Sequence, residues 1–222
     1  MKISVLGTGA VGRAVAGRLD ELGHDVSMAT RDPAATAARD DHADWATVHP
    51  GVRLLAFGEA ASGADLVVNA LGGDIALGVL EEVGPDLAGR VLVDLSNPLD
   101  HSHGFPPRLF VKDDDSLAEQ VQRAHPDALV VKTLNTMNNA VMVDPGRLGE
   151  STSVFMSGDD PGAKGVVAAL LRELGHTDVI DLGGLETARG AEMFLALWVR
   201  TAVALGGSDF NVKVVRGPSL RA

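Results

Sequence analysis

A glycine-rich turn near the start of the chain constrains its fold more than any other feature. An apolar run that begins at Ile3 leads directly into the sequence GTGAVG at residues 7–12, which has the spacing G-x-G-x-x-G and precedes an apolar-periodic helix. Gly7 allows a tight turn, Gly9 lets backbone N–H groups approach a pyrophosphate, and Gly12 lets the helix pack close to the strand. Because a helix N-terminus favours negative charge, the turn predicts a phosphate-binding site. A glycine-rich turn without a ligand is the alternative.

Short apolar runs recur along the chain and predict the rest of the fold. They begin at Ile3, His24, Val52, Asp65, Arg90, Ala128, Ser153 and Asp178, and stretches of helical character separate most of them. Runs such as Leu66–Val68 do not alternate polar with apolar residues, which is typical of strands that are covered on both faces. We therefore predict an α/β fold with a doubly wound, mostly parallel sheet of the Rossmann type and a small C-terminal α/β extension.

The end of the second predicted strand indicates which nicotinamide cofactor the fold accepts. In such folds the residue that contacts the adenosine ribose lies about 20 residues beyond the glycines. An NAD enzyme presents a carboxylate there, whereas this chain has the hydroxyl of Thr30 and the guanidinium of Arg31, a pair that suits a 2′-phosphate. Asp32 precedes a proline and is expected to cap the next helix. The segment therefore predicts NADP(H), with a solvated Arg31 as the alternative.

Composition excludes several classes of function. The net charge of −11 and the absence of a basic stretch argue against nucleic acid or an anionic membrane as a partner. The chain has no cysteine and no tyrosine, which excludes thiolate metal sites, cysteine nucleophiles and the Tyr–Lys pair of short-chain dehydrogenases. His101 and His103 are the close-spaced histidines, and we expect loop residues rather than metal ligands, with no metal site elsewhere. No secretory signal precedes the first strand, so we expect a cytoplasmic protein.

The segment from Glu186 to Leu205 has an apolar surface wider than one helical stripe. We expect it to be buried all round. Either it roofs a crevice or it packs on a second subunit, or it does both. Arg189, Glu192 and Arg200 interrupt the segment and argue against a membrane span. A core helix of a monomer is the alternative.

Polar segments follow three of the strands, at the sheet edge where such folds bind ligands. They are NALGG from Asn69, DLSNP from Asp94 and KTLNTMN from Lys132. With these segments the chain resembles the NADP oxidoreductases that depend on the deazaflavin coenzyme F420, over essentially its whole length. The resemblance rests on the ordered sequences VLGTGAVGRAVAGRL, TRDP, LVDLSNPLD, VVKTLNTMN, SVFMSGDDPGAK and ETARGAEMFLALWVR.

The resemblance implies roles for residues of both halves of the site. On the NADP(H) side it assigns the pyrophosphate to Thr8, Gly9, Ala10 and Val11, the 2′-phosphate to Thr30 and Arg31, and the floor under the ribose to Ala70 and Leu71. On the deazaflavin side it implies contacts from Asn97, Pro98, Leu134, Asn135 and Thr136. It also implies a homodimer. Residues 1–150 are then expected to form the NADP-binding domain, and residues 151–222 an extension on the same sheet that caps the crevice.

Hydride transfer between two cofactors needs stacked rings at a short distance more than it needs a general base. We expect Asn135 and Thr136 to act as catalytic residues by hydrogen-bonding a carboxamide or a deazaflavin carbonyl, with a strand-end turn as the alternative. Lys132 could offset negative charge on a ligand, or lie at a solvated edge.

Three functions stay open. The first is an oxidoreductase that transfers a hydride between NADP(H) and coenzyme F420 or a similar small acceptor. The second is an NADPH-dependent flavin or ferric reductase. The third is a non-catalytic NADP(H)-binding redox sensor, since a sensor would carry the same glycine turn and the same Arg31.

Overall fold

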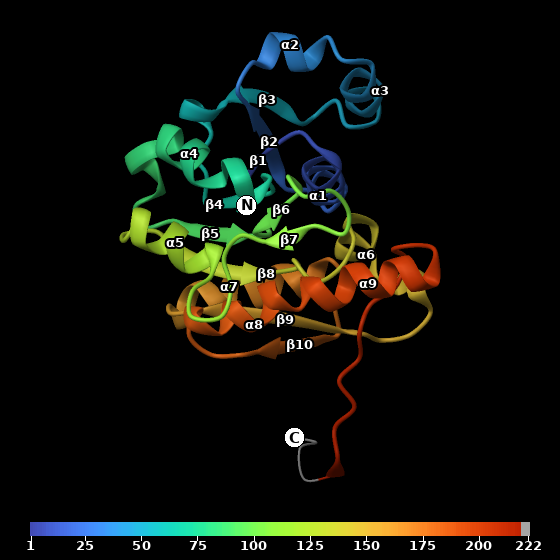
Figure 1. Cartoon of the computed structure of the whole chain (residues 1–222). Coiled ribbons are helices and arrows are strands. Elements are labelled where there is room, and N and C mark those ends of the chain that lie inside the picture. The colour runs from blue at the N-terminus through green and yellow to red at the C-terminus, as the bar shows by residue number, and fades with distance from the viewer. Residues whose placement is uncertain (219–222) are drawn as a thin grey trace.

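The computed structural model describes residues 1–218, and within them eight strands form one sheet in the order β10-β9-β8-β5-β4-β1-β2-β3 (Figure 1). All eight expected strands are present: β1 Lys2–Leu6, β2 Asp25–Thr30, β3 Arg53–Ala56, β4 Leu66–Asn69, β5 Val91–Asp94, β8 Leu129–Thr133, β9 Ser153–Gly158 and β10 Asp178–Asp181. The six strands from β3 to β8 in this order run parallel, β9 is antiparallel to β8, and β10 is parallel to β9. The predicted fold class is therefore confirmed.

Helices cover both faces of the sheet. They are α1 Ala10–Glu21, α2 Pro33–Ala37, α3 Asp40–Val48, α4 Gly73–Val83, α5 Leu117–Ala124, α6 Asn139–Val143, α7 Pro161–Glu173, α8 Ala188–Met193 and α9 Leu195–Leu205, with 3₁₀ turns η1 Phe57–Glu59, η2 Gly84–Leu87, η3 Pro145–Leu148 and η4 Leu185–Thr187. Apolar side chains of α1, α6 and α7 pack on one face, and those of α4 and α5 pack on the other. The central strands of the sheet thereby lie between two layers of helices (Figure 1).

The two cores explain the continuous apolar runs of the sequence. On β4, Leu66 and Val68 point into the core beside α1, whereas Val67 points into the core beside α4. Neighbouring residues of a strand face opposite sides of a sheet, so a strand between two cores needs apolar residues at every position. Burial on both faces follows directly from the sequence pattern.

The irregular stretch after β5 contains a small hairpin that the sequence pattern did not predict. Its strands are β6 Leu99–Asp100 and β7 Arg108–Leu109, which pair antiparallel outside the main sheet. The loop between them carries Phe105, whose side chain is exposed. Asn97, Leu99 and His101 of this stretch line a cavity together with residues that follow β4 and β5.

Residues 186–205 are not buried all round within a single chain, and their burial against a second subunit stays a prediction. The segment divides into η4, α8 and α9, and of the large apolar residues of α9 only Leu195 and Val199 are buried. Leu197, Val203 and Leu205 are 61%, 56% and 65% exposed. Within residues 1–218, no helix is both long and apolar enough to cross a membrane.

The expected C-terminal extension lies partly within the main sheet. Its strands β9 and β10 continue the sheet beyond β8, and α8 and α9 follow them. A domain boundary near residue 150 stays a prediction, as does the capping of the crevice. Residues 219–222 of the expected extension lie outside the described part of the chain.

Candidate functional site

The glycine turn has the geometry that a bound pyrophosphate requires. Gly7 adopts a φ of +105°, and a Cβ added to Gly12 would lie 2.0 Å from the Gly7 carbonyl oxygen, so both positions need glycine. A Cβ added to Gly9 would have no atom of the described chain within 4 Å. Gly9 is the N-cap of α1, and among the described residues no side chain caps this helix. The first-turn N–H groups therefore face open space and fit a phosphate.

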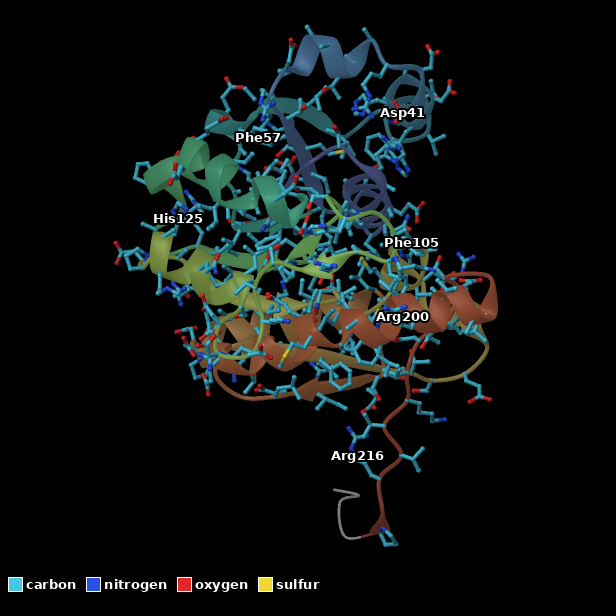
Figure 2. The ribbon with its side chains drawn as sticks, viewed as in Figure 1. Asp41, Phe57, Phe105, His125, Arg200 and Arg216 are labelled. Carbon is cyan, nitrogen blue, oxygen red and sulfur yellow. The ribbon has the colours of Figure 1, made fainter. Side chains whose placement is uncertain are left out.

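Arg13 holds this turn against the neighbouring helix α3. Its Nη1 donates to the carbonyl oxygen of Thr8 and to Oδ2 of Asp41, each at 2.8 Å. Figure 2 labels Asp41, which belongs to α3. From α6, Asn139 donates to the carbonyl oxygen of Ala10 at 3.4 Å. Sequence reasoning missed both supporting residues. Arg13 could have been considered from its place directly after the third glycine.

The two residues expected to bind a 2′-phosphate have different environments. Thr30, at the end of β2, is buried, and its Oγ1 lies 2.9 Å from Oγ1 of Thr36. Arg31 follows it and is exposed. Asp32 accepts a hydrogen bond from the backbone N–H of Ala35 at 2.9 Å, which confirms its expected role as a helix cap. Arg31 is thus the group of this segment that is free to reach a ligand phosphate.

A cavity of about 180 Å³ lies at the carboxyl ends of β4 and β5, roughly the volume of six water molecules in the liquid. Its walls include the predicted residues Val11, Ala70, Leu71 and Asn97, together with Ser96 and His101. The fold therefore joins the first turn of α1, two strand ends and the hairpin segment around one space. The place of His101 was not expected, because it depends on the unpredicted hairpin.

Asn135 supports the wall of this cavity from behind. Its side chain is 2% exposed, and its Nδ2 donates to Oδ1 of Asn97 at 3.1 Å and to the carbonyl oxygen of Ala191 at 3.0 Å. Asn97 in turn donates from Nδ2 to the carbonyl oxygen of Asn135 at 3.1 Å. Both amide hydrogens of Asn135 are used in these bonds. The amide therefore fixes Asn97, which lines the cavity.

The other residues expected near a deazaflavin are also largely enclosed. Leu134 and Thr136 are buried, and Leu134 has a φ of +60°, a left-handed conformation that a bulky residue adopts only where its surroundings enforce it. Pro98 is buried as well, and its carbonyl oxygen accepts from the N–H of Phe110. The described residues that line the cavity do not include Leu134, Asn135 or Thr136. Their direct contact with a ligand stays a prediction.

Lys132 corrects an expectation, because its side chain is fully buried and lies neither at a solvated edge nor in the cavity. Its Nζ lies 2.8 Å from Oδ2 of Asp94 and 3.0 Å from Oε1 of Glu192, and it also donates to the carbonyl oxygen of Ser96. Burial opposes the charge on Lys132, but the two carboxylates outweigh it and hold the pKa of the ammonium above its usual value. The lysine is therefore a buried cation.

Both carboxylates of this cluster accept further hydrogen bonds. Oδ1 of Asp94 accepts from Nδ2 of Asn69 at 2.8 Å and from the N–H and Oγ of Ser96 at 3.1 and 2.7 Å. Glu192, on α8, accepts from the N–H groups of Leu117 and Ala118 at the start of α5, at 2.8 and 3.1 Å. All of these partners donate to the carboxylate oxygens of Asp94 and Glu192.

Strand register explains how distant residues form this cluster. Near the carboxyl ends of the strands, Asp94 of β5 lies opposite Asn69 of β4 on one side and opposite Lys132 of β8 on the other. Each follows buried apolar residues of its strand, and a polar or charged residue in this place could have indicated a buried cluster from the sequence alone. The partner of Lys132 could not be identified before the strand order was known.

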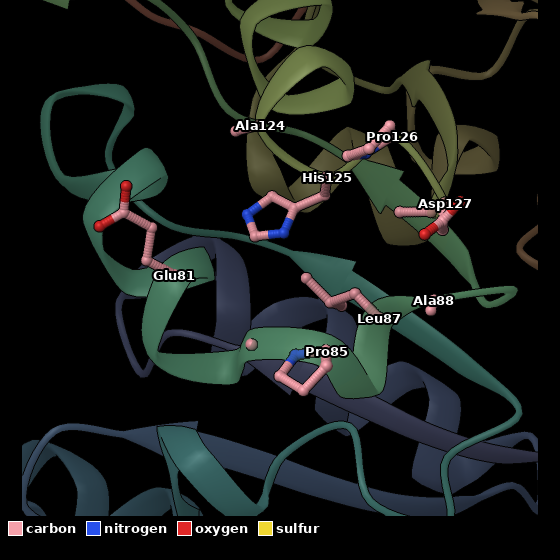
Figure 3. Close-up of a pocket in the computed structure, with 10 residues that line it drawn as sticks. Glu81, Pro85, Leu87, Ala88, Ala124, His125, Pro126 and Asp127 are labelled. Atoms are coloured by element: carbon pink, nitrogen blue, oxygen red, sulfur yellow. The ribbon is translucent and has the colours of Figure 1, made fainter.

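A second hollow, of about 310 Å³, lies at the opposite edge of the sheet (Figure 3). Glu81, Leu87 and His125 line it, next to the residues that lead into the amino ends of β5 and β8. It contains none of the predicted site residues. Because ligands of doubly wound sheets bind at the carboxyl ends of strands, the smaller cavity is the candidate site.

Comparison with known proteins places this geometry in context. A family model described as "NADP oxidoreductase coenzyme F420-dependent" matches residues 2–98. The chain is similar to a provisionally assigned F420-dependent NADP-reductase from Arthrobacter sp. FB24, with which it shares 56% sequence identity. The match covers 97% of this chain and 100% of that one, and the crystal structure of that protein superposes with a TM-score of 0.95.

Two curated proteins are more distant relatives. The chain is 27% identical over 157 residues to the F420-dependent NADP reductase of Methanocaldococcus jannaschii, a match that covers 70% of each protein. It is 29% identical over 210 residues to Metalloreductase STEAP3 of Rattus norvegicus, a match that covers 92% of this chain. The chain spans 39% of the length of that relative.

Proposed function

The chain belongs to the family of coenzyme F420-dependent NADP oxidoreductases and is an NADP-dependent oxidoreductase, and from this premise we propose that it transfers a hydride between NADP(H) and coenzyme F420. The observation that carries the proposal is the continuity of the glycine turn, the exposed Arg31 and the strand-end cavity along one edge of the sheet. When bound, NADPH supplies the hydride.

The residues of the chain contribute binding and orientation. We assign the pyrophosphate to the free N–H groups from Gly9 to Val11 and the 2′-phosphate to the guanidinium of Arg31. Ala70 and Leu71 form an apolar floor of the cavity, suited to a ribose and a flat ring. This division explains why the site needs a shaped backbone more than charged side chains.

On the acceptor side, Asn97 is one of the polar residues that line the cavity, and Asn135 holds it in place. We assign Asn97 to the carboxamide of the nicotinamide or to a carbonyl of the deazaflavin, and Asn135 to its orientation. A catalytic contribution of Asn135 and Thr136 would then act through geometry, because two rings must approach closely for hydride transfer.

An NADPH-dependent flavin or ferric reductase is the second candidate. The likeness to Metalloreductase STEAP3 over 92% of this chain favours it. Since the chain corresponds to 39% of that protein, the resemblance supports an NADPH-oxidising part rather than a complete metal-reducing protein. In this alternative a flavin takes the place of the deazaflavin.

The experiment that separates the two candidates follows NADPH oxidation by the pure protein with coenzyme F420, with flavin mononucleotide or with a ferric chelate. We expect rapid oxidation with F420 and slow oxidation with the other acceptors. Oxidation with flavin or ferric iron and none with F420 would overturn the first candidate. NADH in place of NADPH is the matched control, and it should be a poor donor in every case.

We propose that the protein is a homodimer that uses the exposed apolar side chains of α9. Leu197, Val203 and Leu205 present large apolar surface to solvent on a single helix, which isolated chains seldom leave uncovered. A second copy of the chain is the partner that could bury it symmetrically.

The expected cytoplasmic location stays a prediction.

A further inference from the structure

We propose that the buried cluster of Asp94, Lys132 and Glu192 makes the cavity favour oxidised NADP⁺ over reduced NADPH, and so favours hydride donation by the cofactor. The inference rests on the proposed function, since it requires NADP(H) in the cavity at the ends of β4 and β5. The proposal gives a role to these three buried charged residues, which take no part in binding the phosphates of the cofactor. The role is electrostatic, and these residues need not touch the cofactor.

The cluster lies directly behind the cavity wall. Ser96 lines the cavity, and both its N–H and its Oγ donate to Oδ1 of Asp94. On the other side of Asp94, Lys132 bonds its Oδ2 and is in turn bonded to Glu192. Asp94 and Lys132 are each one hydrogen bond away from the lining residue Ser96, whereas Glu192 is bonded to Lys132 and not to Ser96.

The formal charge of the cluster is negative, with two carboxylates and one ammonium. The side chains of all three are at most 2% exposed, so water screens their charges little. The N-terminus of α5 offsets part of the charge of Glu192, which accepts from Leu117 and Ala118. Asp74 and His101 also line the cavity, but both are exposed and their charges are screened by solvent.

The nicotinamide ring carries a positive charge when oxidised and none when reduced. A negative cluster behind the wall therefore lowers the energy of the oxidised form relative to the reduced form. At an effective dielectric constant of about 20, two unit charges about 12 Å apart interact strongly enough to change a ratio of dissociation constants by about tenfold. The hydride and its two electrons pass to the acceptor, and the cation that remains is the form that the cluster favours.

Two variants make the cluster neutral, and a third keeps its charge of −1 but removes the cation beside Asp94. Asp94→Asn is nearly isosteric and leaves Lys132 balanced by Glu192, so the cluster becomes neutral. Glu192→Gln also makes it neutral, but at the position farther from the cavity. Lys132→Met combined with Glu192→Gln leaves Asp94 as the single charge, still bonded by Asn69 and Ser96, and avoids two unpaired buried carboxylates.

The test measures the dissociation constants of NADP⁺ and NADPH for each protein by calorimetry. We expect the ratio of the NADP⁺ constant to the NADPH constant to rise by about tenfold in Asp94→Asn and by about threefold in Glu192→Gln, and to fall in the double variant. Asp127→Asn is the matched control, because it removes an exposed carboxylate at the opposite hollow and should leave the ratio unchanged (Figure 3).

Each outcome decides the inference. If Asp94→Asn does not fold, Glu192→Gln and the double variant carry the test, since their changes are expected in opposite directions. Folded variants whose ratio equals that of the unmodified protein would overturn the inference and leave the cluster a structural link between β5, β8 and α8. If the unmodified protein binds neither cofactor, the proposed function itself is overturned, and the inference with it.

Discussion

Arg31 and Arg39 are close in sequence but differ in what surrounds them, and this difference decides which of them can bind a phosphate. Arg39 donates from Nε and Nη2 to the carboxylate of Asp41, at 3.0 and 2.8 Å, and this pair holds the pKa of Asp41 below its usual range. Arg31 is exposed next to Thr30. A guanidinium that already pairs with a carboxylate is a poor ligand for a second anion.

Replacing Arg31 by alanine should therefore remove most of the preference for NADPH over NADH. A hydrogen bond to a charged group contributes about 1.5 to 3 kcal/mol, so the unmodified protein should bind NADPH at least about tenfold more tightly than NADH. Titration of both cofactors against Arg31→Ala measures the loss, and Arg39→Ala is the control that should keep the preference. Equal affinities for NADPH and NADH in the unmodified protein would contradict this assignment.

Gly9 and Gly12 have opposite reasons to be glycine, and a pair of substitutions separates them. Gly9 faces open space, so Gly9→Val should cost less than about 1 kcal/mol of unfolding free energy and abolish NADPH binding by filling the place of the pyrophosphate. Gly12→Ala should destabilise the fold, because its Cβ would lie 2.0 Å from the Gly7 carbonyl oxygen. Thermal unfolding and NADPH titration of both variants provide the measurements. Normal NADPH binding by Gly9→Val would show that the turn is structural only.

Asn135 should affect turnover more than it affects binding of NADPH. Its amide fixes Asn97 and the carbonyl oxygen of Ala191, so Asn135→Ala releases a residue of the cavity wall. A displacement of about 1 Å between reacting groups can reduce a rate by about a hundredfold. Steady-state kinetics with F420 should therefore show a large fall in kcat and a small change in the KM for NADPH. A variant in which only the KM for NADPH changes would indicate a direct cofactor contact instead.

Helix α8 does not line the cavity, but two of its residues are hydrogen-bonded to residues behind the cavity wall. The carbonyl oxygen of Ala191 accepts from Asn135, which follows β8. The next residue, Glu192, forms an ion pair with Lys132, which lies near the end of β8. Asn135 and Lys132 in turn contact Asn97 and Ser96 of the wall. Because α9 begins two residues after α8 ends, a displacement of the apolar helix α9 would reach the cavity through these bonds.

The exposed side chains of α9 predict that the protein is dimeric and that this helix forms the contact. Leu197→Glu should shift the protein from dimer to monomer, since a charge in an apolar interface lacks a partner. Val48→Glu is the matched control, because Val48 is 71% exposed on α3, away from this helix. Light scattering measures the mass of both variants. A monomeric unmodified protein, or a dimer that survives Leu197→Glu, would contradict the prediction.

At the scale of the whole molecule, the sequence was sufficient where a feature is local. The eight strands and the glycine turn were predicted because apolar runs and G-x-G-x-x-G are contained in short segments. The β6–β7 hairpin was missed because strands of two residues have no readable period, and the place of His101 was missed with it. Lys132 was misjudged because its burial depends on Asp94 and Glu192, which lie on other elements.

In the proposed function, the protein moves a hydride from NADPH directly to coenzyme F420. The measurement that tests it most directly is a single turnover with NADPH that carries deuterium at the transferred position, followed by mass spectrometry of both products. We predict that the deuterium is recovered in the reduced deazaflavin, and that Gly9→Val gives no transfer because it cannot bind NADPH. Unlabelled reduced F420, or F420 that stays oxidised while NADPH is consumed, would contradict the account.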